Sequence, residues 1–488
     1  MISKFVCEQK RYTQEELRDI LGCTSEKIVN IIKKLKEYGV LKAVKANDMQ
    51  KDMSELINED IDIVDVAMGD SDHLYVCTYV GVIIVAGCVL KCYPKYIIGN
   101  IEPKDELKQV IKVIEKYNSK EQIVSMYNES DEGVSFNILA IMIYLLNDYY
   151  ENGIYTNTQD IIEENGSGEI LWDKTINETF TLLSNNRPYY TELLTKKRTN
   201  DDSDFFKRLH ECLLSRFSDN LEKADLLELF DIMPIDLSDE DLQCFGDNEY
   251  ICYRIEKELN IQFNTRKQCV LKAIYAYISH SMNIDIVNSF SMFGTNSFNL
   301  VWEDVCKEVM DNQLNNSLGS LKLPVRLNDQ YKKEDTLLSI IEKPKWVGKN
   351  LGRDDFEKKA KDSLIPDIIN ISLQGSMWNF IILDAKYYIV QLEASKPLKG
   401  QPGIGDITKQ YLYQLVYKKF IELHSFNGIK NCFLMPTQEK KIINKGYAYM
   451  EILDELKLEH IQIRLMPAVD MYNYYLSGKK MDISKLDL

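Results

Sequence analysis

The 488-residue sequence lacks several patterns by which common protein classes are recognised. Its eleven cysteines include no CxxC pair, which argues against a zinc site or a disulfide scaffold and favours reduced thiols. The five histidines do not cluster, so a histidine-based metal site is not indicated. No apolar run is long enough to cross a bilayer, and the first residues lack the apolar core of a signal peptide. We therefore expect a cytoplasmic protein without a membrane segment.

Two further absences concern nucleotides and nucleic acids. No GxxxxGK[ST] motif occurs, so the chain is not expected to bind a nucleoside triphosphate through a P-loop of its own. The net charge of −16 argues against broad, non-specific binding to nucleic acid, which needs clustered Lys and Arg. Residues 1–45 differ, with ten Lys and Arg against six acids. Contact with DNA is expected through local patches, or through a partner that presents the DNA.

The N-terminal 45 residues carry the pattern of a winged helix-turn-helix. Thr13 precedes one short amphipathic segment, and Thr24 or Ser25 precedes a second, which is followed by the strand-like "VLKAV". In such modules the second helix can enter the major groove of DNA, which makes Thr24, Ser25 and Lys27 candidate DNA contacts. The alternative is a module that serves only in protein contacts or packing.

The length predicts several domains, because one hydrophobic core does not organise 488 residues. Interleaved strand and helix patterns predict a multidomain α/β protein. The expected domains are a winged helix-turn-helix (1–45), a small β-rich domain and candidate partner-docking region (46–130), a helical middle region (131–285), and a C-terminal domain with a mixed sheet flanked by helices (286–488).

The stretch "IPDIINISLQGSMWNFIILDAKYY", residues 365–388, is the strongest candidate for a chemical site. Asp367 precedes one predicted strand, and a second strand carries Asp384 and Lys386, which share a face because side chains alternate. The turn "QGSMWN" brings the strands together, so the two carboxylates and the ammonium converge at one end of a sheet. Ionised groups in an apolar run need partners or a metal.

This set suits hydrolysis of a phosphodiester. Aspartate oxygens are ligands that Mg²⁺, or Mn²⁺, prefers, and a lysine at this spacing can orient the attacking water or stabilise charge on the phosphate. The pattern PD followed by DxK is short, however. A surface aspartate and an exposed Asp–Lys pair at a strand end are the alternative reading of Asp367, Asp384 and Lys386.

Further stretches carry a family resemblance. "PDI" with "ILDAKYY" resembles the core of PD-(D/E)xK nucleases. Together with "YVGVIIVAGCVLKCYPKY", "SFNLVWEDV" and "GDITKQYLYQ", it makes nearly the whole chain resemble the LlaJI family of restriction endonuclease subunits, which are related to McrC of the McrBC systems. The resemblance implies that residues 286–488 form a PD-(D/E)xK endonuclease domain.

The resemblance also implies roles for two helix residues. Glu303 in "VWEDV" matches the acid that such nucleases supply from the helix before the core, with Asp304 and Glu308 as competitors. Gln410 matches a glutamine of the helix after the core. The related Q-x-x-x-Y pattern is not intact, because Gln414 stands where the tyrosine would be.

A partner is implied as well. McrC-like subunits dock on an McrB-like AAA+ GTPase, so GTP would be used by the partner while this chain cuts the DNA, with Asp367, Asp384 and Glu303 as ligands of Mg²⁺. Cleavage of both strands needs two active sites, together or in turn, which makes dimerisation a possibility. The alternative function is a non-catalytic winged-helix adaptor that binds DNA or the motor.

Overall fold

A computed structural model of the chain describes nine stretches of residues. They are 2–45, 73–85, 87–100, 102–120, 127–130, 133–200, 204–280, 290–349 and 354–488. The chain divides into two compact units, one formed mainly by residues 135–291 and the other by residues 2–124 together with 292–488. Residues 46–72, part of the predicted β-rich domain, lie outside the described residues.

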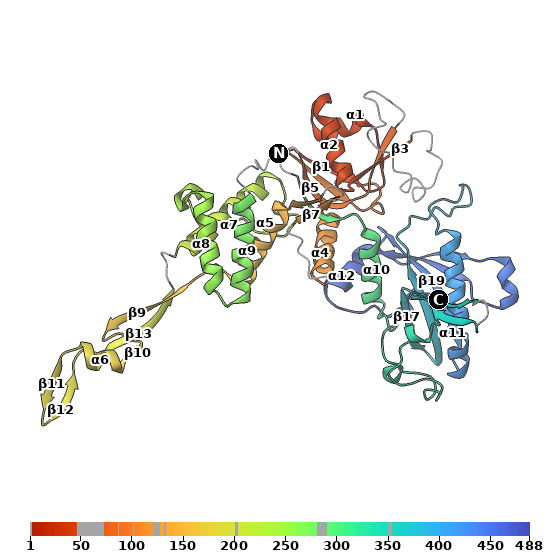
Figure 1. The fold of residues 1–488 in the computed structure, drawn as a ribbon. Coiled ribbons are helices and arrows are strands. Elements are labelled where there is room, and N and C mark those ends of the chain that lie inside the picture. Colours follow the sequence, from red (N-terminus) through yellow and green to blue (C-terminus); the bar gives the residue numbers. More distant parts are fainter. Residues whose placement is uncertain are drawn as a thin grey trace. The chain divides into compact units, whose positions relative to one another are not determined.

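The larger unit begins with the two helices expected from the sequence, α1 (Gln14–Leu21) and α2 (Ser25–Glu37). Thr13 caps α1 in a capping box with Glu16, and Gly22 ends the helix in the left-handed conformation. A three-stranded sheet accompanies the helices (Figure 1), in the order β2 (Arg11–Tyr12), β4 (His73–Cys77), β3 (Leu41–Lys45).

The strand-like stretch 74–98 contributes to two sheets. Its first strand, β4, pairs with β3, while β5 (Val80–Val85) and β6 (Cys88–Tyr93) form an antiparallel pair. β1 (Ile2–Cys7) joins β6 in parallel, and β14 (Ser291–Thr295) lies at the other edge. The long helix α4 (Lys104–Lys120) follows. The sequence did not indicate that the first residues of the chain would enter this sheet.

The C-terminal part of the larger unit is a five-stranded mixed sheet. Its order is β17 (Ile368–Gln374), β18 (Met377–Ala385), β19 (Gly428–Thr437), β21 (Ile461–Pro467), β20 (Ile443–Ala448). β17 and β18 form a hairpin whose turn uses Gly375 at φ +63°, and β18, β19 and β21 run parallel. The hairpin and the parallel strands match the strand pattern predicted from the sequence.

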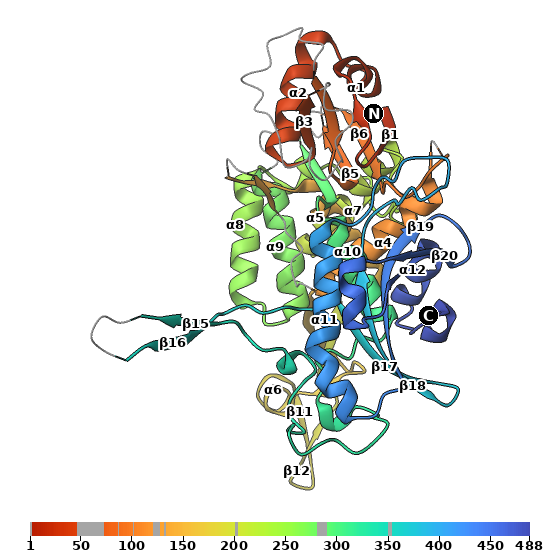
Figure 2. The same ribbon diagram turned by 90° about the vertical axis from the view of Figure 1, so that its right-hand side faces the viewer.

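Helices cover both faces of this sheet (Figure 2). α11 (Ile404–Leu423) packs through Tyr417 and Phe420 against Phe380 and Ile382 of β18, the face that also carries Asp384. The other helices are α10 (Phe298–Val309) and α12 (Ala468–Leu476). The indole of Trp302 on α10 donates to the carbonyl of Leu434 in β19. The stretch before β17 forms an exposed hairpin of polar and apolar residues, β15 (Lys345–Gly348) and β16 (Phe356–Lys359).

The smaller unit is built on four helices. They are α5 (Ile138–Asn152), α7 (Phe205–Lys223), α8 (Asn248–Ile261) and α9 (Thr265–His280). A buried polar network lies among them, because Arg266 forms an ion pair with Asp148 at 2.8 Å and also donates to the carbonyl of Gly153. His210 is fully buried, and its Nδ1 accepts a hydrogen bond from the backbone N–H of Tyr155.

Between α5 and α7 the chain forms a β-rich arm, residues 158–200, where the sequence predicted a helical region. Its elements are β9 (Thr158–Glu164), β10 (Glu169–Ile170), α6 (Trp172–Glu178), β11 (Thr181–Ser184), β12 (Arg187–Tyr190) and β13 (Leu194–Asn200). β9 and β13 pair over seven residues, and β11 and β12 form a hairpin at the tip (Figure 1). The short alternating segments of the arm gave only a weak periodic signal.

The described residues thus form a mixed α/β protein, as predicted. No helix in the described part of the chain is long and apolar enough to cross a membrane.

Candidate active site

The two motif aspartates meet at one end of the five-stranded sheet. Asp367 immediately precedes β17, and Asp384 is the penultimate residue of β18, where Ile368 lies opposite Leu383. Hairpin geometry therefore places the two carboxylates side by side. Oδ2 of Asp367 accepts a hydrogen bond from the backbone N–H of Ala385 at 3.0 Å. Asp384 is buried.

The motif lysine lies between two carboxylates. Nζ of Lys386 is 3.0 Å from Oδ2 of Asp384 and 2.9 Å from Oδ1 of Asp406, in the first turn of α11. Burial works against the charged amine, but Asp384 and Asp406 raise the pKa of Lys386 above its usual range. The amine is therefore a fixed ammonium. This contact confirms that Asp384 and Lys386 share a face. The alternative reading, an exposed Asp–Lys pair at a strand end, is wrong because both side chains are largely buried.

The carboxylates repel one another. Burial is the main cause that raises the pKa of Asp367, and the neighbouring carboxylates of Asp384 and Glu303 raise it further, opposed by Lys386. Two acids in one low-dielectric site do not both ionise readily unless a cation joins them. The site is thus built with more negative charge than its own lysine offsets.

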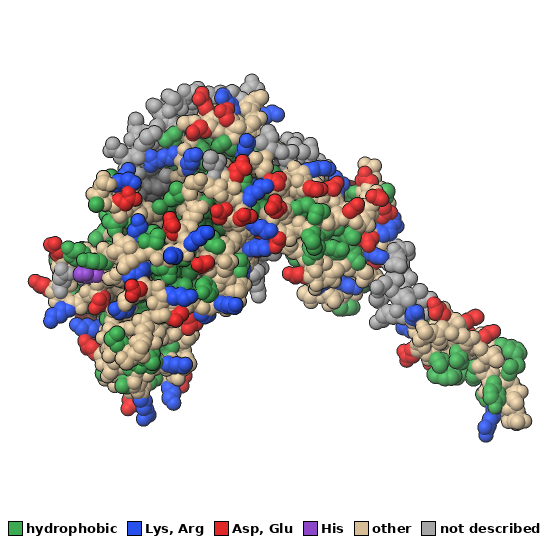
Figure 3. Space-filling model, turned by 180° about the vertical axis from the view of Figure 1, so that it is seen from behind, with side chains coloured by type: hydrophobic (Ala, Val, Ile, Leu, Met, Phe, Trp, Pro, Cys, Tyr) green, Lys and Arg blue, Asp and Glu red, His purple; other side chains and the backbone are tan. Residues whose placement is uncertain are grey.

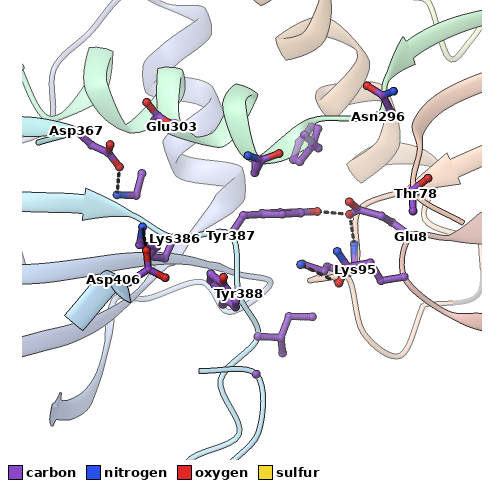
Figure 4. Close-up of a pocket in the computed structure, with 16 residues that line it drawn as sticks. Glu8, Thr78, Lys95, Asn296, Glu303, Asp367, Lys386, Tyr387, Tyr388 and Asp406 are labelled. Carbon is purple, nitrogen blue, oxygen red and sulfur yellow. Dashed lines mark hydrogen bonds and ion pairs between the residues drawn. The ribbon is translucent and has the colours of Figure 1, made fainter. Parts of the chain in front are cut away.

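Asp367 and Lys386 line a cavity of about 570 Å³ (Figure 4), while the buried Asp384 contacts Lys386 but is not part of the lining. Glu303, Asp367, Lys386 and Asp406 lie at one end. Glu303 comes from α10 and forms an ion pair with Lys307 one turn later. The competing acids of that helix are engaged elsewhere: Asp304 accepts from the hydroxyl of Tyr475, and Glu308 pairs with Lys116 at 2.9 Å. Of the three acids, Glu303 is the one in the cavity wall.

Gln410 is not part of this wall. It is fully buried one turn after Asp406, and its side-chain amide has no hydrogen-bond partner among the described residues. Gln414 has a structural role, because its amide both donates to and accepts from the backbone of Glu459. Tyr413, on the same helix, donates to the carbonyl of Ile365, two residues before Asp367.

The candidate DNA contacts at the start of α2 lie apart from the cavity. Thr24 is the N-cap residue and is exposed, and its side chain makes no capping hydrogen bond. Lys27 is also exposed. Ser25 is the first residue of the helix. Their role in DNA binding stays a prediction.

Two contributors to the cavity were missed in the sequence. Asp406 belongs to the stretch "GDITKQYLYQ", but only the packing of α11 on β18 brings it to Lys386. Lys95 comes from "CYPKY" in the N-terminal part and lines the opposite end of the cavity. A lysine after a strand is no signal by itself, and its distance in sequence from residue 386 hides the contact.

The carboxylates of Asp367 and Asp384 fit Mg²⁺, although they do not supply all of its ligands. Among the described residues, no group of three or more His, Cys, Asp or Glu side chains is arranged to hold a metal ion. Mg²⁺ in proteins is commonly held by one or two carboxylates, with water and substrate phosphate completing its octahedron. Asp367 and Asp384 supply such a pair, and the mutual repulsion described above favours a cation between them.

Comparison with known proteins shows the family of the chain. The family model of the LlaJI restriction endonuclease matches residues 79–472. The chain belongs to this restriction endonuclease family. A relative in Bacillus subtilis (strain 168), described as the type II restriction enzyme BsuMI component YdjA, is 27% identical over 496 residues, covering 99% of this chain and 91% of the relative. The resemblance read from the sequence is thereby confirmed.

Two solved structures from Thermococcus gammatolerans are similar at low level. A half-complex from a tetradecameric assembly of McrB AAA+ hexamers with bound McrC matches with a TM-score of 0.33 and 10% identity, covering 100% of this chain and 96% of that one. The McrBC complex matches with a TM-score of 0.25 and 12% identity, covering 62% and 86%.

Proposed function

We propose that this member of the LlaJI family is the Mg²⁺-dependent DNA endonuclease subunit of a GTP-dependent restriction system. The observation that carries the proposal is the convergence of Asp367, Asp384 and Lys386 at the rim of one sheet, where Asp367 and Lys386 line a cavity. Bound at the two carboxylates, Mg²⁺ would lower the pKa of the attacking water and offset charge on the scissile phosphate.

Each residue then has a distinct part. Asp367 and Asp384 hold the cation, and the hydrogen bond from the N–H of Ala385 fixes one carboxylate oxygen of Asp367. Lys386, charged and fixed between Asp384 and Asp406, donates to the water or to a phosphate oxygen. Glu303 lines the cavity beside them and would act as a base toward the attacking water. Mn²⁺ fits the same oxygen ligands.

DNA would reach this site through a partner, an McrB-like AAA+ GTPase. Three facts support that arrangement: the chain has no P-loop, its net charge is −16, and the described face in Figure 3 interleaves acidic and basic side chains without one broad basic surface. GTP would be bound by the partner.

The β-rich arm is the surface best suited to a protein partner. It exposes a set of large apolar side chains, visible as green patches in Figure 3: Ile162, Trp172, Ile176, Phe180, Leu182, Leu183 and Tyr189. A protein that stays monomeric rarely leaves so much apolar surface in water. We place the contact with the AAA+ partner on the tip hairpin, β11 and β12.

The test is DNA cleavage by the purified chain with its GTPase partner, GTP and Mg²⁺. Asp384→Ala should abolish cleavage, because the cation loses one of its two carboxylates, while partner binding is retained. EDTA should abolish cleavage by the parent protein. Full cleavage by Asp384→Ala would refute the site.

The alternative function, a non-catalytic winged-helix adaptor, predicts the opposite result. A winged-helix subunit with a disused nuclease domain would support partner and DNA binding, and neither EDTA nor Asp384→Ala would change any reaction. Strong cleavage without partner or GTP would instead indicate a nuclease that acts alone.

A further inference from the structure

The cavity of the candidate active site has a second end, formed by the N-terminal part of the chain. Glu8, Gln9, Thr78 and Lys95 line this end, whereas the acids and Lys386 lie at the other (Figure 4). Tyr387, the residue directly after the motif lysine, lies between the two groups. The motif residues and the N-terminal part of the chain therefore line the same cavity.

Lys95 is held in that wall by several contacts. Its Nζ donates to Oε1 of Gln9 at 2.9 Å and lies 4.4 Å from the ring centre of Tyr387 and 5.8 Å from that of Tyr388. Ammonium groups over aromatic faces are attracted by the negative ring face. The amide of Gln9 and the two tyrosine rings thus position the lysine, which is only half-buried.

Hydrogen bonds and ring contacts also fix the backbone that carries Lys95. The buried carboxylate of Glu8 accepts from the backbone N–H of Lys95 at 3.2 Å and from the hydroxyl of Tyr387. The same tyrosine ring packs edge-on against Tyr96 and tilts against Phe298. The backbone that carries the motif lysine is therefore joined to the wall that carries Lys95.

The lining of the cavity carries charges of both signs. Its acids are Glu8, Glu303, Asp367 and Asp406, and its two lysines are Lys386, which pairs with two carboxylates, and Lys95, which lies next to Glu8 and Gln9. A DNA strand brings one negative charge with every nucleotide, and a cation at Asp367 and Asp384 offsets charge at one phosphate only. Hydroxyl and amide groups of Thr78, Asn296 and Asn299, which suit phosphate and sugar oxygens, line the same cavity as Lys95.

We propose that Lys95 binds a backbone phosphate of the DNA strand next to the phosphate that is cut. The N-terminal part of the chain thus supplies one wall of the substrate site. This inference rests on the proposed endonuclease function, since it assigns the strand in the cavity as the substrate.

A competing role for Lys95 is purely structural, as the counter-charge of Glu8. The two roles separate in a double-mutant cycle with Glu8→Gln, which removes the carboxylate charge but keeps a hydrogen-bonding side chain. If Lys95 only neutralises Glu8, then Lys95→Met has no effect on DNA binding in the Glu8→Gln background. If Lys95 binds phosphate, the loss persists there.

The experiment measures binding of a short fluorescein-labelled oligothymidylate to the full chain in EDTA, by fluorescence anisotropy over a range of NaCl concentrations. Lys95→Met should weaken binding about tenfold and lower the slope of log K against log salt by about one. Lys95→Arg should retain the parent slope, because the charge remains. Lys223→Met is the matched control, since that exposed lysine pairs with Asp219 in the other unit and should leave the slope unchanged.

Any of three results would overturn the inference. The first is that Lys95→Met binds with the same salt slope as the parent chain. The second is loss of the Lys95→Met effect in the Glu8→Gln background, and the third is a parent chain that does not bind the oligonucleotide. The outcome is distinguishable from the test of the proposed function: Lys95-dependent binding together with cleavage unaffected by Asp384→Ala keeps the phosphate contact and rejects the metal site.

Discussion

Lys386 at the end of β18 is joined to Asp406 of α11 by an ion pair of 2.9 Å. The pair connects the end of β18 to the helix that covers its face, and both side chains are largely shielded from water. Without this second carboxylate, Lys386 would be drawn wholly toward Asp384, which is one of the proposed metal ligands.

Asp406→Asn should therefore reduce cleavage without abolishing it. The ammonium loses one of the two groups that fix it, so we expect kcat to fall roughly tenfold, about 1.4 kcal/mol in the barrier. Steady-state cleavage of plasmid DNA by the complete system measures the change. Asp470→Asn is the control, because Asp470 occupies the corresponding first turn of α12 and is exposed. Equal activity of Asp406→Asn and the parent would show that Asp406 is not needed to position Lys386 for cleavage.

Replacing a crowded acid should stabilise the metal-free protein. Asp367→Asn keeps an oxygen for the N–H of Ala385 but removes the charge that burial and Asp384 disfavour. We expect the melting temperature in EDTA to rise by about 2–4 °C, as for a gain of about 1 kcal/mol in a large domain. Mg²⁺ should raise the melting temperature of the parent but not of Asp367→Asn. A variant that melts lower than the parent in EDTA and still responds to Mg²⁺ would contradict the assignment of Asp367.

His210 should make the helical unit sensitive to acid. Burial lowers the pKa of His210 to about 4, with Asp148 opposing the shift and Arg266 adding to it. Its ordinary pKa is about 6.5, so the folded state resists a proton that the unfolded state accepts. The contribution of the neutral His210 to the free energy of unfolding is present in full above about pH 6.5. It is lost as the pH falls toward 4, by up to about 3 kcal/mol in total.

The measurement for His210 is urea unfolding at about pH 7 and about pH 5. His210→Gln keeps an acceptor for the N–H of Tyr155 but does not titrate, so its loss of stability between the two pH values should be smaller than that of the parent. An equal loss in parent and variant would show that other groups cause the acid sensitivity.

The arm should be needed for the partner but not for folding. Phe180 and Leu183 are 71% and 76% exposed, so Phe180→Asp and Leu183→Asp should leave the melting temperature unchanged. Binding to the GTPase should weaken by roughly 30-fold or more, as for loss of an interface hot spot. Co-purification and titration of the two subunits measure the effect. Phe263→Asp is the control, because Phe263 is 92% exposed in the same unit but lies outside the arm. Similar losses in all three variants would reject the arm as the contact.

The sequence was most informative where local pattern and tertiary packing agree. Alternation along "NFIILDAKYY" placed Asp384 and Lys386 on one face, and the structure joins them at 3.0 Å. The helices α10 and α11 were expected on another ground, since the family resemblance places Glu303 and Gln410 on helices before and after the core.

The remaining features depend on contacts between segments that are distant in sequence. Asp406 reaches the site only because Tyr417 and Phe420 dock α11 on β18. The parallel pairing of β1 with β6 brings Glu8 and Gln9 next to Lys95, and sequence periodicity carries no information about that pairing. The arm was missed for a different reason, since its strands are short and their apolar side chains face solvent.

The hydrogen bond between Tyr387 and Glu8 has a consequence for how such a protein can be divided. A fragment that began at residue 286 would keep every motif residue of the nuclease core, yet it would open the cavity on one side and leave the Tyr387 hydroxyl without its acceptor. We therefore expect that residues 286–488 expressed alone will not be an active nuclease. Recombination between members of this family should keep the N-terminal strands and residues 286–488 from the same parent.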